Sequence, residues 1–473
     1  MGRRWWLWPA LVVTATLAPF WRVIAGAVTL VSRDTFELYE PMRALIVPAL
    51  RAGRLPLWNP YEAAGVPLFA QALHGVLHPV SIVTALPPFE GLDAAVVLYV
   101  VAAAMGAYAL ARTLGATPAA SACAAFGYGL GGYTVSMAAN IVFLAGAASA
   151  PWTLAAMRRC AAPGSAPRHV VGVAVAVAVT AFSGEFESLA WSLALGSVLA
   201  ADAGGRRGLA RSVVGAGLGI LVAGVQLVPS WVFLQRTTRG DALDVAERLQ
   251  WPLEPWRLVE WIAPGFFWSV DASPFLLLGG ETQHAVPFAE SVFIGGAVLV
   301  LALGGVGRSR TARLLVMFAG LCLWQALGYR LGAAQLTSFV PIWGEFRYAE
   351  KLMAPITLCA AVLCALGADR VTTAGPPRWL ERAAMGLLVA VAMAGVVSWL
   401  APGAVRAFFL AAGRGQGPTP PPPEFVAAAA SSRDHLARGV LRAVPFLAAL
   451  VLLLRTVRVH RAAWALPALA WVV

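Results

Sequence analysis

Long apolar runs constrain this chain more than any other feature of its sequence. The first of them, residues 5–31, is long enough as a helix rising 1.5 Å per residue to cross a hydrocarbon core of about 30 Å. Comparable runs recur along the chain, and hydrophobic residues make up 59% of it against 12% for charged residues. Soluble globular proteins do not carry so apolar a composition. The sequence therefore predicts an all-α polytopic membrane protein with a bundle of about 12–13 transmembrane helices.

The net charge of +12 follows the expected topology of the chain and does not indicate a polyanionic partner. With the N-terminus placed in the cytoplasm, the inner loops hold arginine pairs, such as Arg206 with Arg207 and Arg310 with Arg313, and very few acids. Cytoplasmic loops of membrane proteins carry this excess of basic residues. No nucleic acid partner is therefore expected, whereas membrane lipids are. The whole chain, 1–473, is expected to form a single membrane domain with long outer loops at 32–91, 235–289 and, rich in proline, 402–439.

The expected spans follow from the length of each apolar run. By this criterion they are 5–31, 92–111, 115–134, 141–157, 169–184, 186–203, 211–234, 290–306, 312–328, 348–367, 383–401 and 440–454, with a thirteenth run starting near residue 462. Arg22 lies inside the first of these runs, where a charge is costly in lipid. It must face a cavity or a partner, unless that helix tilts or ends early.

The first outer loop holds the candidate catalytic acids. Asp34 follows the first apolar run directly, and Glu37 comes three residues later, so that on a helix both carboxylates share one face. Arg33 stands beside them. Further along, glycine and proline recur too often for one regular helix, and aromatic residues suited to the headgroup zone occur among them. Short interfacial helices are expected in this loop.

Two other charged pairs are candidates for binding a substrate. Glu185 and Glu187 lie in FSGEFES between two expected spans, where they can bind sugar or acceptor hydroxyls from the outer side or form a short solvated turn. Arg347 and Lys351 have i, i+4 spacing at the outer end of a span. They can bind a phosphate from one helix face, or they can simply extend to the lipid headgroups.

Three further patterns do not favour a bound metal, nucleotide or disulfide. His74 and His78 have the i, i+4 spacing of metal ligands, but no third ligand lies nearby in the sequence. The glycines of residues 127–132 follow no predicted strand, so they favour close helix packing over nucleotide binding. The five cysteines show no CxxC spacing. The cofactor stays open: a divalent metal held by Asp34 and Glu37 is the one candidate.

A series of short motifs resembles the YfhO-type bacterial membrane proteins, which are placed among the GT-C glycosyltransferases. In order they are an acid after the first span, GRLPLWNPYEAAGVP, GYGLGGY followed by a Pro-Trp span end, VQLVPS, and EFRYAEKL before a later span. The resemblance implies a GT-C-like bundle in the bacterial cytoplasmic (inner) membrane. It also implies transfer of a sugar from a polyprenyl-phosphate donor to an extracytoplasmic glycan, lipid or protein acceptor of the cell envelope.

In the GT-C fold the acid of the first outer loop is catalytic, and here it corresponds to Asp34, with Glu37 next. The chain reads RDTFE and not D-x-D, which leaves open which acid is the base and whether a metal is held. Transfer needs a carboxylate for the acceptor's proton and positive charge for the leaving phosphate, for which Arg347, Lys351 and Arg33 are candidates. The alternatives are a transporter or flippase for an envelope lipid or glycan, and a non-catalytic scaffold. Span interiors with few acids disfavour the transporter.

Overall fold

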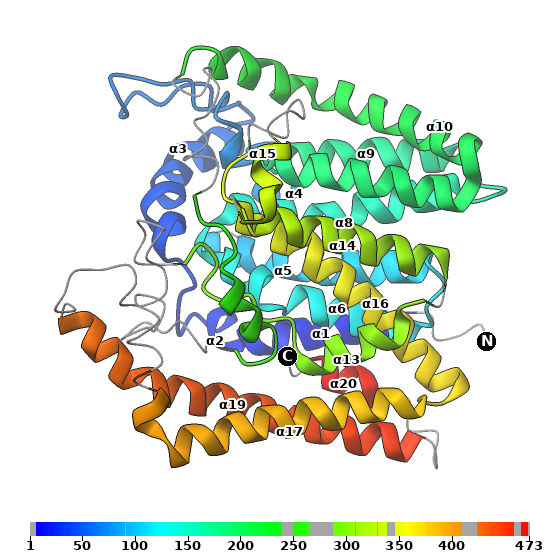
Figure 1. Ribbon diagram of the computed structural model, residues 1–473. Coiled ribbons are helices and arrows are strands. Elements are labelled where there is room, and N and C mark those ends of the chain that lie inside the picture. The colour runs from blue at the N-terminus through cyan, green and yellow to red at the C-terminus, as the bar shows by residue number, and fades with distance from the viewer. Residues whose placement is uncertain are drawn as a thin grey trace. The chain divides into compact units, whose positions relative to one another are not determined.

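The computed structural model describes residues 6–89, 91–237, 250–264, 287–307, 309–328, 330–337, 346–405, 407, 423–457 and 465–471. Every regular element in these residues is helical, apart from one isolated bridge between Asn59 and Val66 (Figure 1), so the all-α prediction is confirmed. Most of the second long outer loop and the proline-rich centre of 402–439 lie outside the described residues.

The helices have the following bounds. In chain order they are α1 (Leu7–Leu17), η1 (Ala18–Phe20), α2 (Trp21–Ile24), η2 (Thr35–Tyr39), α3 (Glu40–Arg51), η3 (Ala72–His74), α4 (Pro79–Val83), α5 (Leu92–Thr113), α6 (Pro118–Gly129), α7 (Gly132–Ser136), η4 (Met137–Ala139), α8 (Ile141–Ala161), α9 (Arg168–Phe182), α10 (Phe186–Leu234), η6 (Pro255–Trp261), α13 (Gly296–Gly305), α14 (Arg310–Ala326), η7 (Arg330–Gly332), α15 (Ala333–Thr337), η9 (Ala349–Leu352), α16 (Met353–Ala374), α17 (Arg378–Leu400), α19 (Pro423–Val457) and α20 (Ala465–Trp471).

Their contacts divide the chain into two compact units, which are described separately. Unit 1 comprises Met1–Leu130, Thr134–Leu243 and Gly307–Phe318, and unit 2 comprises Gly131–Tyr133, Asp244–Val306 and Ala319–Val473. The single membrane domain expected from the sequence stays a prediction.

Several helices are long and apolar enough to cross a bilayer, so the chain is a multi-pass membrane protein. Seven such segments occur in the described residues: Leu7–Ile24, Leu92–Thr113, Ile141–Ala161, Phe186–Leu234, Ala349–Ala374, Arg378–Leu400 and Leu436–Thr456. The cytoplasmic placement of the N-terminus and the bacterial inner membrane stay predictions.

The sequence predicted about twelve spans, more than these seven segments, because an apolar run also includes residues that form helix caps and turns. The run 115–134, for example, contains the 12-residue α6 and the first residues of the short α7, since Thr117 caps the start of α6 and Pro118 opens its first turn. In the other direction, α10 continues across two expected spans and bends at Gly204 and Gly205. Gly205 has φ 59° and ψ −149°, a conformation open essentially to glycine alone.

The first expected span, 5–31, is too long. Helical structure there ends at Ile24, and residues 25–32 leave the helix as turns and extended chain. Arg22 therefore lies in the last helical turn of the candidate span Leu7–Ile24, where it is exposed, and not in the middle of that span. The early end of the helix removes the cost that a charge in mid-membrane would carry.

Unit 1 is packed around α8, which contacts α5, α9 and α10. Small residues allow these contacts: a Cβ atom on Gly106 of α5 would lie 2.9 Å from the Trp152 ring, and the indole N–H of Trp152 donates to the Ala102 carbonyl at 2.9 Å. Gly129 of α6 packs just as closely on Ala104. The prediction that the glycines of 127–132 serve helix packing is confirmed at Gly129.

In unit 2 the backbones of α13 and α16 approach each other closely at two glycines. A Cβ atom on Gly367 would lie 1.8 Å from the Leu301 carbonyl oxygen, and one on Gly305 would lie 2.3 Å from the Leu363 carbonyl oxygen. Only glycine fits at such a crossing, as is common between membrane helices. In the same unit α17 and α19 pack side by side (Figure 1).

The motif GRLPLWNPYEAAGVP forms a short hairpin in unit 1. Asn59 and Val66 exchange two backbone hydrogen bonds of 2.8 and 2.9 Å, and the Asn59 side chain is fully buried. Gly65 has φ 113°, and a Cβ atom there would lie 2.6 Å from the Trp58 ring. Gln226 of VQLVPS donates to the Phe69 carbonyl just beyond the hairpin at 2.7 Å. The VQLVPS motif is therefore bonded to the chain two residues beyond the hairpin motif.

Candidate functional site

Asp34 lies at the start of an unusual helical turn. Before it, the chain leaving the first helix is held by α5, because the Leu30 N–H donates to the Asp93 carboxylate at 2.7 Å. After it, Thr35–Tyr39 forms the π-helix η2, and π turns are rare and often mark functional sites. Asp34 and Glu37 are both exposed. The two acids were expected to share one face of an α-helix, but they lie instead at a π turn. Pro41 follows in the first turn of α3.

Asn140 orients the Asp34 carboxylate. The Asn140 side-chain amide donates to Asp34 Oδ2, while its carbonyl Oδ1 accepts from the Tyr39 hydroxyl at 3.0 Å. At the other end of η2, the Thr35 hydroxyl donates to the Ala138 carbonyl at 2.8 Å. Because the Tyr39 proton occupies the carbonyl side of Asn140, its NH₂ group must face Asp34. The π turn is thus tied at both ends to the segment just before α8.

The buried Tyr39 hydroxyl stays protonated. Burial and the neighbouring Asp34 charge both raise the pKa of Tyr39, so this group remains a hydrogen-bond donor at neutral pH. Sequence reasoning missed both Tyr39 and Asn140. A polar asparagine between two apolar runs was a visible signal, but its partner lies 106 residues earlier in the chain.

The two histidines of the loop 32–91, His74 and His78, are neutral structural groups. His78 Nδ1 accepts from the Val80 N–H and lies 3.2 Å from the Tyr99 hydroxyl, so its proton resides on Nε2, 3.0 Å from Ser149 Oγ. Burial lowers the pKa of His78 to about 3 and that of His74 to about 4. Both ring nitrogens of His78 are occupied, so it is not placed to bind a metal. In the described residues no group of three His, Cys, Asp or Glu side chains is arranged for a metal ion.

Glu185 and Glu187 are buried, so the solvated turn considered for them is wrong. Glu185 caps α10 by accepting from the Ser188 N–H. Gly146 of α8 packs against it, since a Cβ atom there would lie 2.8 Å from the Glu185 Cβ. Gly184 packs still more closely on the carbonyl of Ala72, two residues before His74. The structure therefore brings the FSGEFES turn to α8 and to the loop 32–91, and binding of hydroxyls by these acids stays a prediction.

Arg347 and Lys351 do not share a helix face, because the helix begins only at Ala349. The backbone of Tyr348, which lies between them, is in the left-handed conformation, with φ 67°. Both cations nevertheless reach its ring: Arg347 Cζ lies 5.2 Å and Lys351 Nζ 5.9 Å from the ring centroid. Trp251 and Phe288 pack on the same ring at centroid distances of 4.8 and 5.5 Å. We call these five residues the cation–aromatic cluster.

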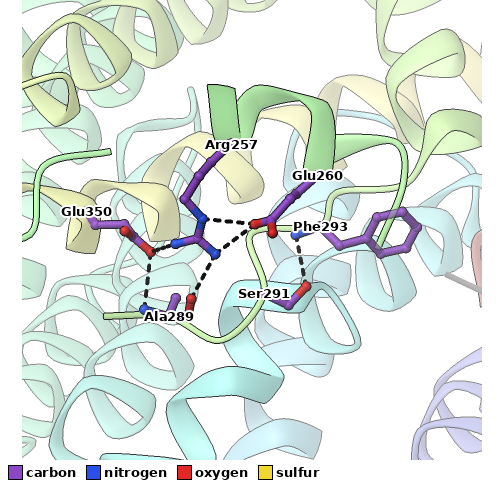
Figure 2. A network of polar contacts seen from close by, with 6 residues as sticks. All are labelled: Arg257, Glu260, Ala289, Ser291, Phe293 and Glu350. Atoms are coloured by element: carbon purple, nitrogen blue, oxygen red, sulfur yellow. Dashed lines mark hydrogen bonds and ion pairs between the residues drawn. The ribbon is translucent and has the colours of Figure 1, made fainter. Parts of the chain in front are cut away.

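Unit 2 also contains a fully buried ion network (Figure 2). It includes Glu350, which directly precedes Lys351 of the cluster in the chain. Arg257 pairs with Glu260 at 2.7 Å and with Glu350 at 2.6 Å, and all three side chains are at most 2% exposed. Arg257 also donates to the Ala289 carbonyl at 2.9 Å, and the Ala289 N–H donates to Glu350 at 3.1 Å. Sequence reasoning missed this network. The i, i+3 spacing of Arg257 and Glu260 was a signal, but Glu350 lies 93 residues away.

Comparison with known proteins gives a likeness in structure only. No family model matches the chain, and no curated protein matches it. Crystal structures of ArnT from Cupriavidus metallidurans are similar at 15% sequence identity over 98% of this chain. The apo structure has a TM-score of 0.49 over 75% of ArnT, and the structure bound to undecaprenyl phosphate has 0.46 over 76%. At this distance no ArnT residue assigns a role to a residue of this chain.

Proposed function

We propose that this chain is a membrane glycosyltransferase that transfers a sugar from a polyprenyl-phosphate donor to an extracytoplasmic acceptor of the bacterial cell envelope. The observation that carries the proposal is the Asp34 carboxylate, which is exposed just after the first membrane helix and oriented by Asn140. The resemblance of the sequence motifs to the GT-C family supports the same activity.

Asp34 is the proposed general base. The Asn140 amide donates to Asp34 Oδ2 and fixes the direction of the carboxylate, so Asp34 is oriented to take the proton of an acceptor hydroxyl. Within the described residues the amide engages Oδ2, which leaves Oδ1 to receive that proton. Glu37, exposed on the same turn, either binds a sugar hydroxyl or shares a divalent metal with Asp34.

Arg347 and Lys351 are the proposed ligands of the donor's phosphate. Two cations over one aromatic ring offer charge-assisted hydrogen bonds to a phosphate beside an apolar surface, as a lipid phosphate requires. Arg33, next to Asp34, is a further candidate for the phosphate. Glu187, buried within FSGEFES in the first turn of α10, is proposed to bind acceptor or sugar hydroxyls, while Glu185 caps the start of that helix.

The first experiment is Asp34→Asn in the purified full-length protein with polyprenyl-phosphate sugar as donor. The amide cannot accept the acceptor's proton, so turnover should fall on the order of 10²-fold or more. Because Asp34 is exposed, the free energy of unfolding should change by less than about 0.5 kcal/mol. Glu40→Gln, which neutralises another exposed acid in the first turn of α3, is the matched control and should retain the parent rate.

Glu37→Gln distinguishes the two roles of that acid. A small loss indicates a sugar-binding role, whereas a loss equal to that of Asp34→Asn, together with inhibition of the parent by a chelator, indicates a shared metal. Transfer at the parent rate by Asp34→Asn contradicts the catalytic assignment. If envelope glycans are also unchanged by mass analysis when the protein is absent, a transporter or a scaffold replaces the transferase.

A further inference from the structure

Each aromatic residue of the cation–aromatic cluster is attached to the buried ion network through the backbone. The Glu350 N–H donates to the Trp251 carbonyl at 3.1 Å. Phe288 precedes Ala289, whose N–H and carbonyl are both bonded by network side chains. Tyr348 stands two residues before Glu350, and Lys351 follows it directly. Glu350 is therefore the residue through which the network meets all parts of the cluster.

The conformation of the cluster needs such support. Tyr348 at φ 67° and Trp251 at φ 49° are both in the left-handed region, which bulky side chains rarely occupy. Residues with strained backbone conformations persist only where the surrounding structure holds them in place. The side-chain rings of these two residues pack on each other with a centroid distance of 4.8 Å. A network buried to 2% or less is well suited to hold them, because hydrogen bonds between charges are strong and directional in a low-dielectric interior.

We infer that Glu350 is a positioning residue: through Arg257 and Ala289 it sets where Arg347 and Lys351 stand to receive the anionic headgroup of a lipid phosphate. Glu350 itself is buried and does not touch the lipid phosphate. The inference rests on the proposed function, since it requires that a lipid phosphate binds to these two cations.

The test is equilibrium binding of undecaprenyl phosphate to the full-length protein in detergent, which requires no sugar transfer. Glu350→Asp and Glu260→Asp form a matched pair, because each keeps its charge beside Arg257 and shortens one carboxylate side chain by one methylene. Glu350→Gln keeps the length and the acceptor oxygen. Thermal unfolding and size-exclusion chromatography establish that each variant is folded.

Glu350→Asp should weaken undecaprenyl phosphate binding about tenfold, the loss expected when one charge-assisted contact is misplaced. Glu350→Gln should restore most of the affinity, and Glu260→Asp should bind as the parent does while losing a similar amount of thermal stability. Equal weakening by both aspartate variants, or parental affinity in Glu350→Asp, shows a purely structural network and overturns the inference. If the parent itself binds no undecaprenyl phosphate, the proposed function fails as well, so the two failures are distinguishable.

Discussion

The Asp34 site of unit 1 and the Arg257 network of unit 2 use charge in opposite ways. Asp34 is exposed and is held by one neutral amide. Arg257 has no exposed surface and is enclosed by two carboxylates and a carbonyl. An exposed acid keeps its capacity to exchange a proton, whereas a buried, paired charge is fixed in place and costly to disturb. The first arrangement is suited to chemistry and the second to holding a shape.

The two regions are nevertheless built alike, because each joins a loop residue to the start of a long helix. Asn140 directly precedes α8, and Glu350 lies in the η9 turn that leads into α16. A membrane helix satisfies its own backbone hydrogen bonds and is rigid, so polar groups at its ends provide fixed attachment points for loops. The lesson is that a helix start can orient either a reactive group or a structural one.

The largest expected effect concerns Arg257→Met, which leaves two buried carboxylates without their cation. Breaking a buried ion pair in this way should cost about 3–5 kcal/mol of unfolding free energy. Denaturant unfolding of the purified protein measures it, with the exposed Asp34→Asn as the reference variant. If Arg257→Met lowers the free energy of unfolding by less than about 1 kcal/mol, the network is hydrated. The contrast between a buried network and the exposed Asp34 site would then be lost.

The next effect is a pH dependence of the stability of unit 1. It shows whether the loop 32–91 is stabilised by buried neutral groups such as His78. Burial lowers the pKa of His78 to about 3, so between pH 6.5 and 3 the unfolded chain binds a proton that the folded chain does not. Stability from His78 is therefore complete above about pH 6.5 and falls as the pH drops, by up to about 1.4 kcal/mol per unit.

His78→Gln should make this decline in thermal stability, measured between pH 7 and pH 4, less steep without abolishing it, because the lowered pKa of His74 gives a similar dependence. His169→Gln, which changes a half-buried histidine at the start of α9, should alter the slope less. If the slopes of His78→Gln and the parent coincide, His78 is hydrated in solution, and the first outer loop is looser than the contacts of His78 indicate.

The smallest expected effect is on the orientation of Asp34. Asn140→Ala removes the amide that holds the carboxylate, and turnover should fall about tenfold with little change in donor KM, the loss of one charge-assisted hydrogen bond in the reacting geometry. Tyr39→Phe keeps the buried ring but frees the Asn140 amide to rotate, so its loss should be smaller. Parental turnover in both variants would mean that Asp34 acts without a fixed orientation.

The sequence by itself determined the all-helical membrane class and the local position of the candidate acids. Long apolar runs leave few alternatives to helices, because in lipid each segment must satisfy its own backbone hydrogen bonds. The position of Asp34 after the first helix, and the close packing at Gly129, follow from composition and local pattern.

Only the tertiary structure decided which polar groups meet. The partners Asn140 and Glu350 lie 106 and 93 residues from Asp34 and Arg257, and the burial of Glu185 depends on α8 and the first outer loop. The same is true of Arg347 and Lys351. They do not share a helix face, but both cations lie over the Tyr348 ring. The physical reason is that local periodicity sets the face of one helix, whereas a hydrogen bond or ion pair across the chain depends on how all the intervening helices pack.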